Sequence, residues 1–395
     1  MYDYAALDAA PHVTVVGNIN PYLADGPNVV VTKRSAPLDG RPKMRCGSKP
    51  TDGGFLILSA EERTELLASF PTAADWVRPY IGSEEFINGS QRWCLWLKGV
   101  APAAIRAVKP VMERVEAVRK FREASTAAPT RATASTPGQF FFVSQPATDY
   151  ILVPEVSSER RRYVPVGWMS PNIISSNKNY IVSEPSLWIF GMLQSVMHMA
   201  WLATVGGRLK SDFQYSASLV YNNFPWPDPP GSPTTVRTER SRPQDGEVEV
   251  SPPGPSTSAA DAAYAQGERG GLDVQDARSE KHRAPIETAA QAVLDVRAAF
   301  PDSTLADLYD PLSMPPALVK AHQNLDRAVD VAYIAAEKAA GRKTPKLTTD
   351  AERVAFLFER YQQLTSLLPA AKTKPVRRKR ITPKSATAKD GDTTC

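Results

Sequence analysis

The stretch YILVPEVSSERRRY, residues 150–163, places a strand-like apolar run directly before three consecutive arginines. Guanidinium groups fit phosphate oxygens and guanine edges, and three in a row are hard to explain by packing. If Arg160, Arg161 and Arg162 extend the strand, they alternate between its two faces. The stretch therefore predicts a sheet that carries a DNA-contacting segment. A sheet edge charged against aggregation is the alternative interpretation.

Short strand and helix patterns alternate around this stretch, between residues 19 and 228. A helix is expected from Ser59 to about Ser69, because Glu62 stands at the capping-box position. Apolar alternation and turn residues predict further strands at residues 29–32, 55–58, 92–98, 140–143, 163–168 and 180–182. These patterns predict an α+β fold class with a mixed sheet.

Two longer helices are expected in the same domain. One begins at Pro110, with an apolar stripe that includes Phe121 and with Arg122 among the basic residues opposite it. The other is an uncharged run from Leu187 to Val205, which is nearly long enough to cross a bilayer. It is the only such run and contains polar groups such as His198, so we expect a buried helix against a sheet.

Composition divides the rest of the chain. Residues 1–18 read as an entry segment, and residues 19–228 as one α+β domain. Pro, Gly, Ser and charged residues dominate 229–285, which predicts a disordered insert because too little apolar surface is available to offset ordering. Helical periodicity over 286–370 predicts a small all-α domain, and the basic residues 371–395 predict a disordered tail that attracts nucleic acid.

Basic and hydroxyl side chains elsewhere are further candidates for DNA contact. Residues 208–211 follow the buried helix, where they suit phosphate clamping or, alternatively, capping of the helix C-terminus. Residues 33–49 are expected to form a basic loop flanked by Gly and Pro that can follow a groove or simply be solvated. The predicted DNA-contacting residues are Arg160, Arg161, Arg162, Ser157, Arg208, Lys210, Ser211, Lys33, Arg34 and Arg45.

Signals for catalysis are weak. Asn20-Pro21-Tyr22 lacks one proline of the Asn/Asp-Pro-Pro-Tyr/Phe motif with which amino-methyltransferases hold an extruded base. No glycine-rich turn between a strand and a helix offers a cradle for a nucleotide or S-adenosylmethionine. Three cysteines without paired spacing predict no zinc site and fit a reducing cytoplasm. We therefore expect no catalytic, cofactor-binding or metal-binding residues.

Several segments together resemble one known family. The segments are residues 18–23, 53–58, 78–82, 86–89, 92–97, 157–163, 197–201, 207–212 and 221–227. They are similar to the target-recognition domain of the MmeI-like, type IIL restriction–modification enzymes. Residues 305–312 and 314–316 resemble the helical C-terminal domain of the same family.

Enzymes of that family are single chains in which a nuclease, a helical connector and an S-adenosylmethionine-dependent adenine methyltransferase precede these two regions. The resemblance implies a module that recognises double-stranded DNA, with no cofactor in this chain and S-adenosylmethionine in a missing or partner domain. The implied partners are DNA and a methyltransferase or nuclease domain or subunit. Two alternatives remain: a subunit that is active with a separate catalytic chain, and a truncated remnant without function.

Overall fold

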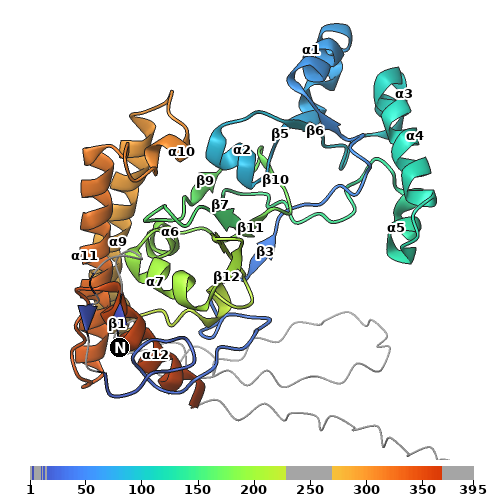
Figure 1. Cartoon of the computed structure of the whole chain (residues 1–395). Coiled ribbons are helices and arrows are strands. Elements are labelled where there is room, and N and C mark those ends of the chain that lie inside the picture. Colours follow the sequence, from blue (N-terminus) through green and yellow to red (C-terminus); the bar gives the residue numbers. More distant parts are fainter. Residues whose placement is uncertain (1, 4–9, 11, 14–15, 228–268, 367–395) are drawn as a thin grey trace, which may run out of the picture.

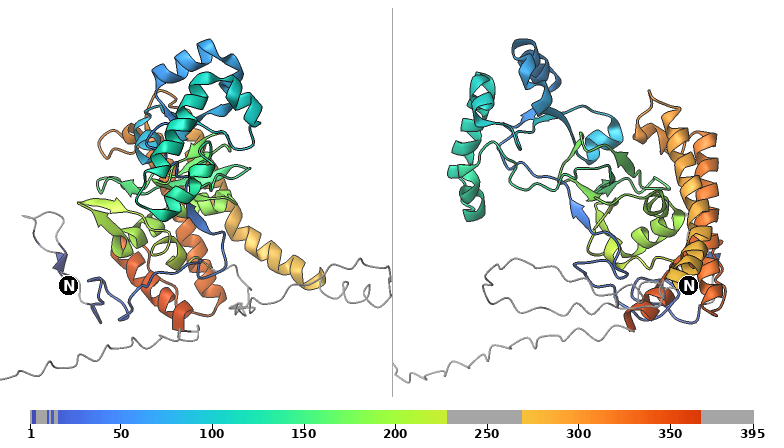
Figure 2. Two further views of the ribbon diagram at one scale, coloured as in Figure 1. Left: turned by 90° about the vertical axis from the view of Figure 1, so that its right-hand side faces the viewer. Right: turned by 180° about the vertical axis from the view of Figure 1, so that it is seen from behind.

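The computed structural model describes residues 2–3, 10, 12–13, 16–227 and 269–366. The predicted basic tail and most of the predicted insert and entry segment lie outside these residues. Figure 1 shows three parts: long helices along one side, strands in the middle, and an outer lobe of helices and strands on the other side. Figure 2 shows the same order from behind.

The apolar run of residues 150–154 forms strand β7 (Tyr150–Pro154), which is buried along its whole length. It lies inside a four-stranded antiparallel sheet of order β3 (Met44–Cys46), β11 (Asn179–Val182), β7 and β9 (Gly167–Met169). A continuous apolar run fits this position, because both faces of the strand are covered.

A second, mixed sheet belongs to the outer lobe. Its order is β10 (Ile174–Ser175), β5 (Val77–Ile81), β6 (Trp93–Leu95) and β4 (Ile57–Leu58), and only the β10–β5 pair is parallel. Its core is separate from that of the central sheet and includes Leu56, Leu95 and Val111. The elements associated with this lobe are α1 (Ala60–Ser69), η1 (Pro71–Trp76), α2 (Ser83–Asn88), α3 (Pro102–Ala107), α4 (Lys109–Glu123), α5 (Ala128–Ala132) and η2 (Thr133–Ser135).

A third sheet is small, with order β12 (Gly207–Leu209), β13 (Asp212–Gln214) and β8 (Val156–Ser157). The short helix η3 (Tyr221–Asn223) follows it, and β1 (Tyr2–Asp3) pairs with β2 (His12–Val13) near the N-terminus.

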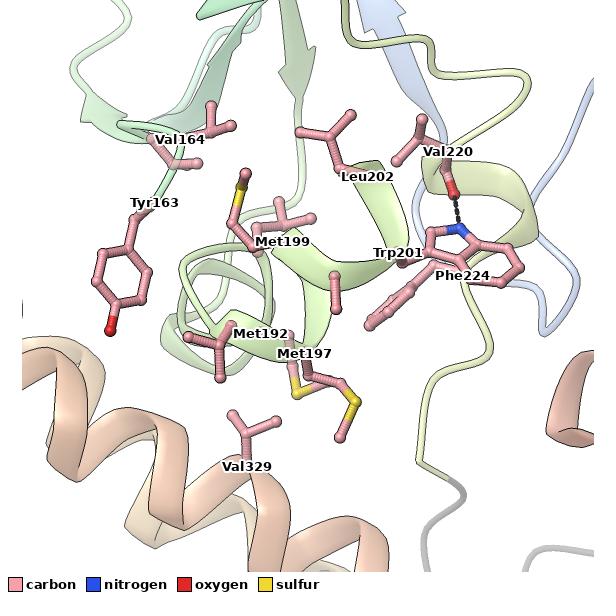
Figure 3. Close-up of a cluster of buried hydrophobic side chains, with 14 of the residues drawn as sticks. Tyr163, Val164, Met192, Met197, Met199, Trp201, Leu202, Val220, Phe224 and Val329 are labelled. Carbon is pink, nitrogen blue, oxygen red and sulfur yellow. Dashed lines mark hydrogen bonds between the residues drawn. The ribbon is translucent and has the colours of Figure 1, made fainter. Parts of the chain in front are cut away.

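The helical part consists of α9 (Arg269–Ala298), α10 (Leu305–Leu308), α11 (Pro316–Ala339) and α12 (Asp350–Ser366). Helices α9 and α11 pack on α6 (Leu187–Leu193), and α11 and α12 pack on α7 (Val196–Val205). One apolar core therefore extends from the central sheet into the helical part. Figure 3 shows Met197 and Val329 facing each other across this junction. The α+β class followed by helices is as the sequence predicts.

Several local predictions hold and others fail. The capping box at Ser59 and Glu62 is present. Residues 29–32 and 140–143 are not strands. Helix α9 begins at Arg269, so residues 269–285 of the predicted disordered insert are helical. The prediction of disorder rested on composition alone. Several residues between 278 and 284 have a high helix propensity, and the helix continues through them and through Pro285.

The predicted helix over residues 187–205 is in fact two helices, α6 and α7, at an angle of 54°. The Ser195 hydroxyl accepts a hydrogen bond from the His198 backbone N–H and caps α7. Among the described residues, no single helix has the length and apolar character needed to cross a membrane, and the bent pair passes that test only when both helices are taken together.

The predicted orientation of Arg122 is also wrong. The prediction placed this residue on the solvent face of its helix, but Arg122 is fully buried in α4. Its guanidinium donates to the backbone oxygens of Pro50, Thr51, Thr133, Thr136 and Gln139. Phe121, which the prediction placed inside, is 42% exposed.

Candidate nucleic-acid interface

The three arginines do not extend a strand. They follow β8 in a turn, which is closed by a 3.2 Å hydrogen bond from the Arg161 N–H to the Ser158 carbonyl. Their side chains have three different environments. Arg160 is exposed, Arg161 is half-buried and Arg162 is exposed but paired. The prediction of alternating strand faces is therefore replaced by a turn in which each guanidinium has its own surroundings.

Arg162 forms an ion pair with Asp350 at the start of α12. Both of its terminal nitrogens bind the carboxylate, and the Nη2–Oδ1 distance is 3.0 Å. Burial opposes ionisation of Asp350, but the hydrogen bond and the charge of Arg162 outweigh it and lower the pKa of Asp350. The charge of Arg162 is thus largely compensated within the protein.

Arg160 and Arg161 differ from Arg162 in this respect. Across the part of the chain that the structure describes, neither side chain has a carboxylate at ion-pair distance, and the buried Nε of Arg161 has no hydrogen-bond partner. Burial lowers the pKa of Arg161, and the charges of Asp212 and Asp310 partly offset this effect. These two guanidiniums remain available to an external anion.

The hairpin β12–β13 adds cations beside this turn. Arg208 lies over the ring of Phe213, with its Cζ 4.0 Å from the ring centroid. It also donates to the carbonyls of Ser211 and, at 3.5 Å, of Ala203 in the last turns of α7. Arg208 therefore contacts the C-terminal end of α7, as one of the two interpretations predicts, and it remains exposed. Lys210 at the tip is exposed and has a φ of 56°.

Strand pairing joins the hairpin to the arginine turn. Phe213 of β13 is opposite Ser157 of β8, and the Glu159 N–H donates to the Asp212 carboxylate over 3.3 Å. The strand register therefore brings residues about fifty positions apart in the sequence to the same end of this small sheet. Ser157 itself is 3% exposed, and its hydroxyl has no partner among the described residues.

The remaining predicted residues lie elsewhere. Arg34 donates from Nε to the Asn223 side chain over 3.0 Å, and Asn222 donates to the Arg34 carbonyl. This residue therefore fastens its loop to η3. Lys33 is exposed nearby. Arg45 lies on β3 and lines a separate hollow of about 590 Å³ together with Lys43. The structure does not bring these three residues into the arginine turn.

A groove of about 1080 Å³ lies along the arginine turn. Met199, Ala203 and other residues of α7 line it, with Asp350 and Val354 of α12 along another side. Ile19 and residues 22–25 contribute a further part of its lining. Sequence patterns do not predict that α12 takes part, because Asp350 is almost two hundred positions from Arg162 and lies in no motif.

The Asn20-Pro21-Tyr22 segment beside this groove forms a tight turn. The Asn20 side-chain oxygen accepts hydrogen bonds from the Tyr22 and Ala24 N–H groups, at 2.9 and 3.1 Å. The Tyr22 hydroxyl accepts from the Val31 N–H, and its ring lies 5.1 Å from that of Phe358. The Asn20 oxygen and the Tyr22 hydroxyl thus have partners within the fold, whereas the buried Nδ2 of Asn20 has none among the described residues.

Comparisons with known proteins identify the family to which this chain is similar. Residues 25–228 match the family described as MmeI, target recognition domain, and residues 277–369 match MmeI, C-terminal domain. DNA methyltransferase A of Bacillus subtilis (strain 168) is 33% identical over 351 residues, which are 89% of this chain and 33% of that protein.

A solved structure of the type IIL restriction–modification enzyme MmeI in complex with DNA is also similar. It has 40% sequence identity and a TM-score of 0.71, and the match covers 93% of this chain and 41% of that chain. The present chain therefore spans well under half the length of both relatives.

Proposed function

The chain belongs to the MmeI family, and we propose that it recognises a specific sequence in double-stranded DNA as part of a type IIL-like restriction–modification or DNA adenine methyltransferase system. Its two matched regions are the recognition and C-terminal domains of that family. A related protein of this family has been solved in complex with DNA. Such a module would act in the cytoplasm, where bacterial DNA lies.

One observation carries the proposal. The β8–β13–β12 sheet brings the arginine turn and the tip of the β12–β13 hairpin, with their cations, to the same end of the sheet. Arg160 and Arg161 lack an ion-pair partner among the described residues, and Lys210 stands at the exposed tip. Cations held in this way neutralise phosphates and release counterions, while neighbouring loop residues are free to read base edges in the major groove.

We also place methyl transfer and strand cleavage outside these two regions. A methyltransferase or nuclease, as another domain or a separate subunit, would bind S-adenosylmethionine and act on the DNA that this module selects. The support is that both matched descriptions name recognition or C-terminal regions. The turn geometry of Asn20 is a second support, because its side-chain oxygen is already used by two backbone N–H groups.

DNA binding can be tested by selecting duplexes from a random pool and measuring their affinity by fluorescence anisotropy at several salt concentrations. The double variant Arg160→Ala/Arg161→Ala should bind more weakly. The slope of log K against log salt should become shallower by roughly 2, because about one counterion is released per phosphate contact.

The matched control removes two exposed cations from the outer lobe, with Arg106→Ala/Lys109→Ala, and should leave the slope unchanged. An unchanged slope in the arginine-turn variant would show that this turn does not contact DNA phosphates. A selection that enriches no sequence would contradict specific recognition altogether.

The location of catalysis needs a separate assay. The purified chain is incubated with the selected duplex and S-adenosylmethionine that carries a labelled methyl group. We expect no transfer of label without an added subunit. Repeated turnover by the purified chain alone would show that the catalytic residues lie within it.

A further inference from the structure

We propose that the helical C-terminal part positions the arginine turn for DNA, with Asp350 and Asp326 as the positioning residues. This inference rests on the proposed function, because it concerns how the DNA-contacting side chains are held. It assigns Arg162 an anchoring role, whereas its neighbours, the exposed Arg160 and the half-buried Arg161, have no ion-pair partner among the described residues.

The first anchor is the ion pair of Arg162 with Asp350. Asp350 is itself fixed from a second side, because Arg353 approaches its Oδ1 to 3.3 Å. Arg353 also binds Asp330 of α11 at 2.7 Å, and its side chain is 9% exposed. The carboxylate that receives Arg162 therefore belongs to a network that spans α11 and α12.

The second anchor is the hydrogen bond between Tyr163, the next residue along the chain, and Asp326. The Tyr163 hydroxyl donates to Oδ2 of Asp326 on α11 over 2.8 Å. The other oxygen of Asp326 accepts from the Val196 N–H at the start of α7, also over 2.8 Å. The Tyr163 ring stacks on His322 with centroids 4.0 Å apart. Figure 3 shows the Tyr163 side chain pointing toward the helices of the C-terminal part.

These two anchors act on one end of the turn, whereas the hairpin holds the other end through Asp212 and the Glu159 N–H. Arg160 and Arg161 lie between the two fixed ends. Ordering a flexible side chain at an interface has an entropic cost, so a turn that is ordered before DNA arrives binds more tightly. The helical part thus supports recognition without touching DNA through these residues.

A competing interpretation makes Arg162 a DNA contact that Asp350 holds back until phosphate displaces it. The two interpretations predict opposite results for Asp350→Asn. Under our proposal the variant loses the anchor, so affinity for the selected duplex falls about three- to tenfold while the salt slope is preserved. Under the competing interpretation Arg162 is released, and affinity rises.

Arg162→Met, which removes the ion pair from its other side, provides the second variant. We expect the same loss of affinity as in Asp350→Asn with the salt slope preserved, whereas loss of a phosphate contact would make the slope shallower by about 1. Tyr163→Phe, which removes the hydroxyl that donates to Asp326, should weaken binding in the same direction.

The control is Glu116→Gln, which breaks an exposed ion pair with Arg119 in the outer lobe and should change nothing. Thermal unfolding of each variant separates loss of anchoring from loss of the fold. Tighter or unchanged binding by a folded Asp350→Asn, or a shallower salt slope in Arg162→Met, would overturn the proposal. If the wild-type protein bound no duplex, the proposed function itself would fail and this inference with it.

Discussion

Arg122 illustrates how one residue can join distant loops. Helical spacing places it on the same stripe as Val111, Val115 and Val118 of α4, so it points into the protein. There it binds backbone oxygens of two loops, residues 50–51 and 133–139, which the chain brings to the same side of the helix. A guanidinium can satisfy this many acceptors because it presents five N–H donors in one plane.

We predict that Arg122→Met destabilises the fold by roughly 3–5 kcal/mol, because the buried carbonyl groups lose their shared donor. Urea unfolding monitored by tryptophan fluorescence measures the change. Arg119→Met, on the exposed side of the same helix, serves as the matched control and should cost less than about 0.5 kcal/mol. Equal unfolding midpoints for the two variants would contradict this account.

At the scale of elements, the two four-stranded sheets approach each other closely at the end of β3. The Gly47 N–H donates to the Asn179 carbonyl over 2.9 Å and continues the pairing with β11. A Cβ at position 47 would stand 2.2 Å from the Ser176 carbonyl oxygen and 2.6 Å from that of Ser175. Glycine is therefore required there by the backbone of the β10 segment.

Gly47→Ala should destabilise the protein by roughly 2–4 kcal/mol, because backbone atoms cannot move aside as a flexible side chain could. The matched control is Gly17→Ala, since a Cβ at that position meets nothing within 4 Å. Differential scanning calorimetry on both variants measures the effect. A melting temperature for Gly47→Ala equal to that of the control would show that the two sheets can separate without cost.

At the scale of the whole molecule, the shared core contains ionisable groups whose pKa values are shifted by burial in the direction that favours the neutral form. Burial lowers the pKa of His198 to about 3, and burial together with the Arg297 charge lowers that of His322 to about 3. Each contributes stability that is present above the unfolded pKa of about 6.5 and is lost as the pH falls. Burial raises the pKa of Asp326 to about 6, so its contribution is present at low pH and is lost as the pH rises through 6.

Of these three groups, the two histidines should therefore contribute most to the change in stability between pH 7 and pH 5. We expect the free energy of unfolding to fall by roughly 2–3 kcal/mol over this interval, from a loss of about 2 kcal/mol per histidine that Asp326 offsets by about 1. Asp326→Asn removes that offset and should lose about 1 kcal/mol more than the wild type. Urea titrations at both pH values measure this difference, and an identical loss in both proteins would contradict the assignment to Asp326.

The sequence by itself determined the local features of this protein and its family. The capped helix α1, the buried strand β7 and the helices of the C-terminal part follow from caps and apolar periodicity, which act between neighbours in the chain. The resemblance to MmeI-like enzymes, carried by short motifs, is confirmed by both matched regions. The DNA-contacting roles of the ten predicted residues stay predictions.

Tertiary structure alone decided how those residues are used. Three adjacent arginines look equivalent in sequence, yet Arg162 is paired with Asp350 while Arg160 faces outward. The sequence pattern predicts a solvated Arg122, whereas in the fold its guanidinium donates to backbone carbonyls of two other segments of the chain. The physical reason is that the state of a charged side chain depends on which opposite charges and dipoles lie within a few ångströms, and chain folding brings those partners from distant positions.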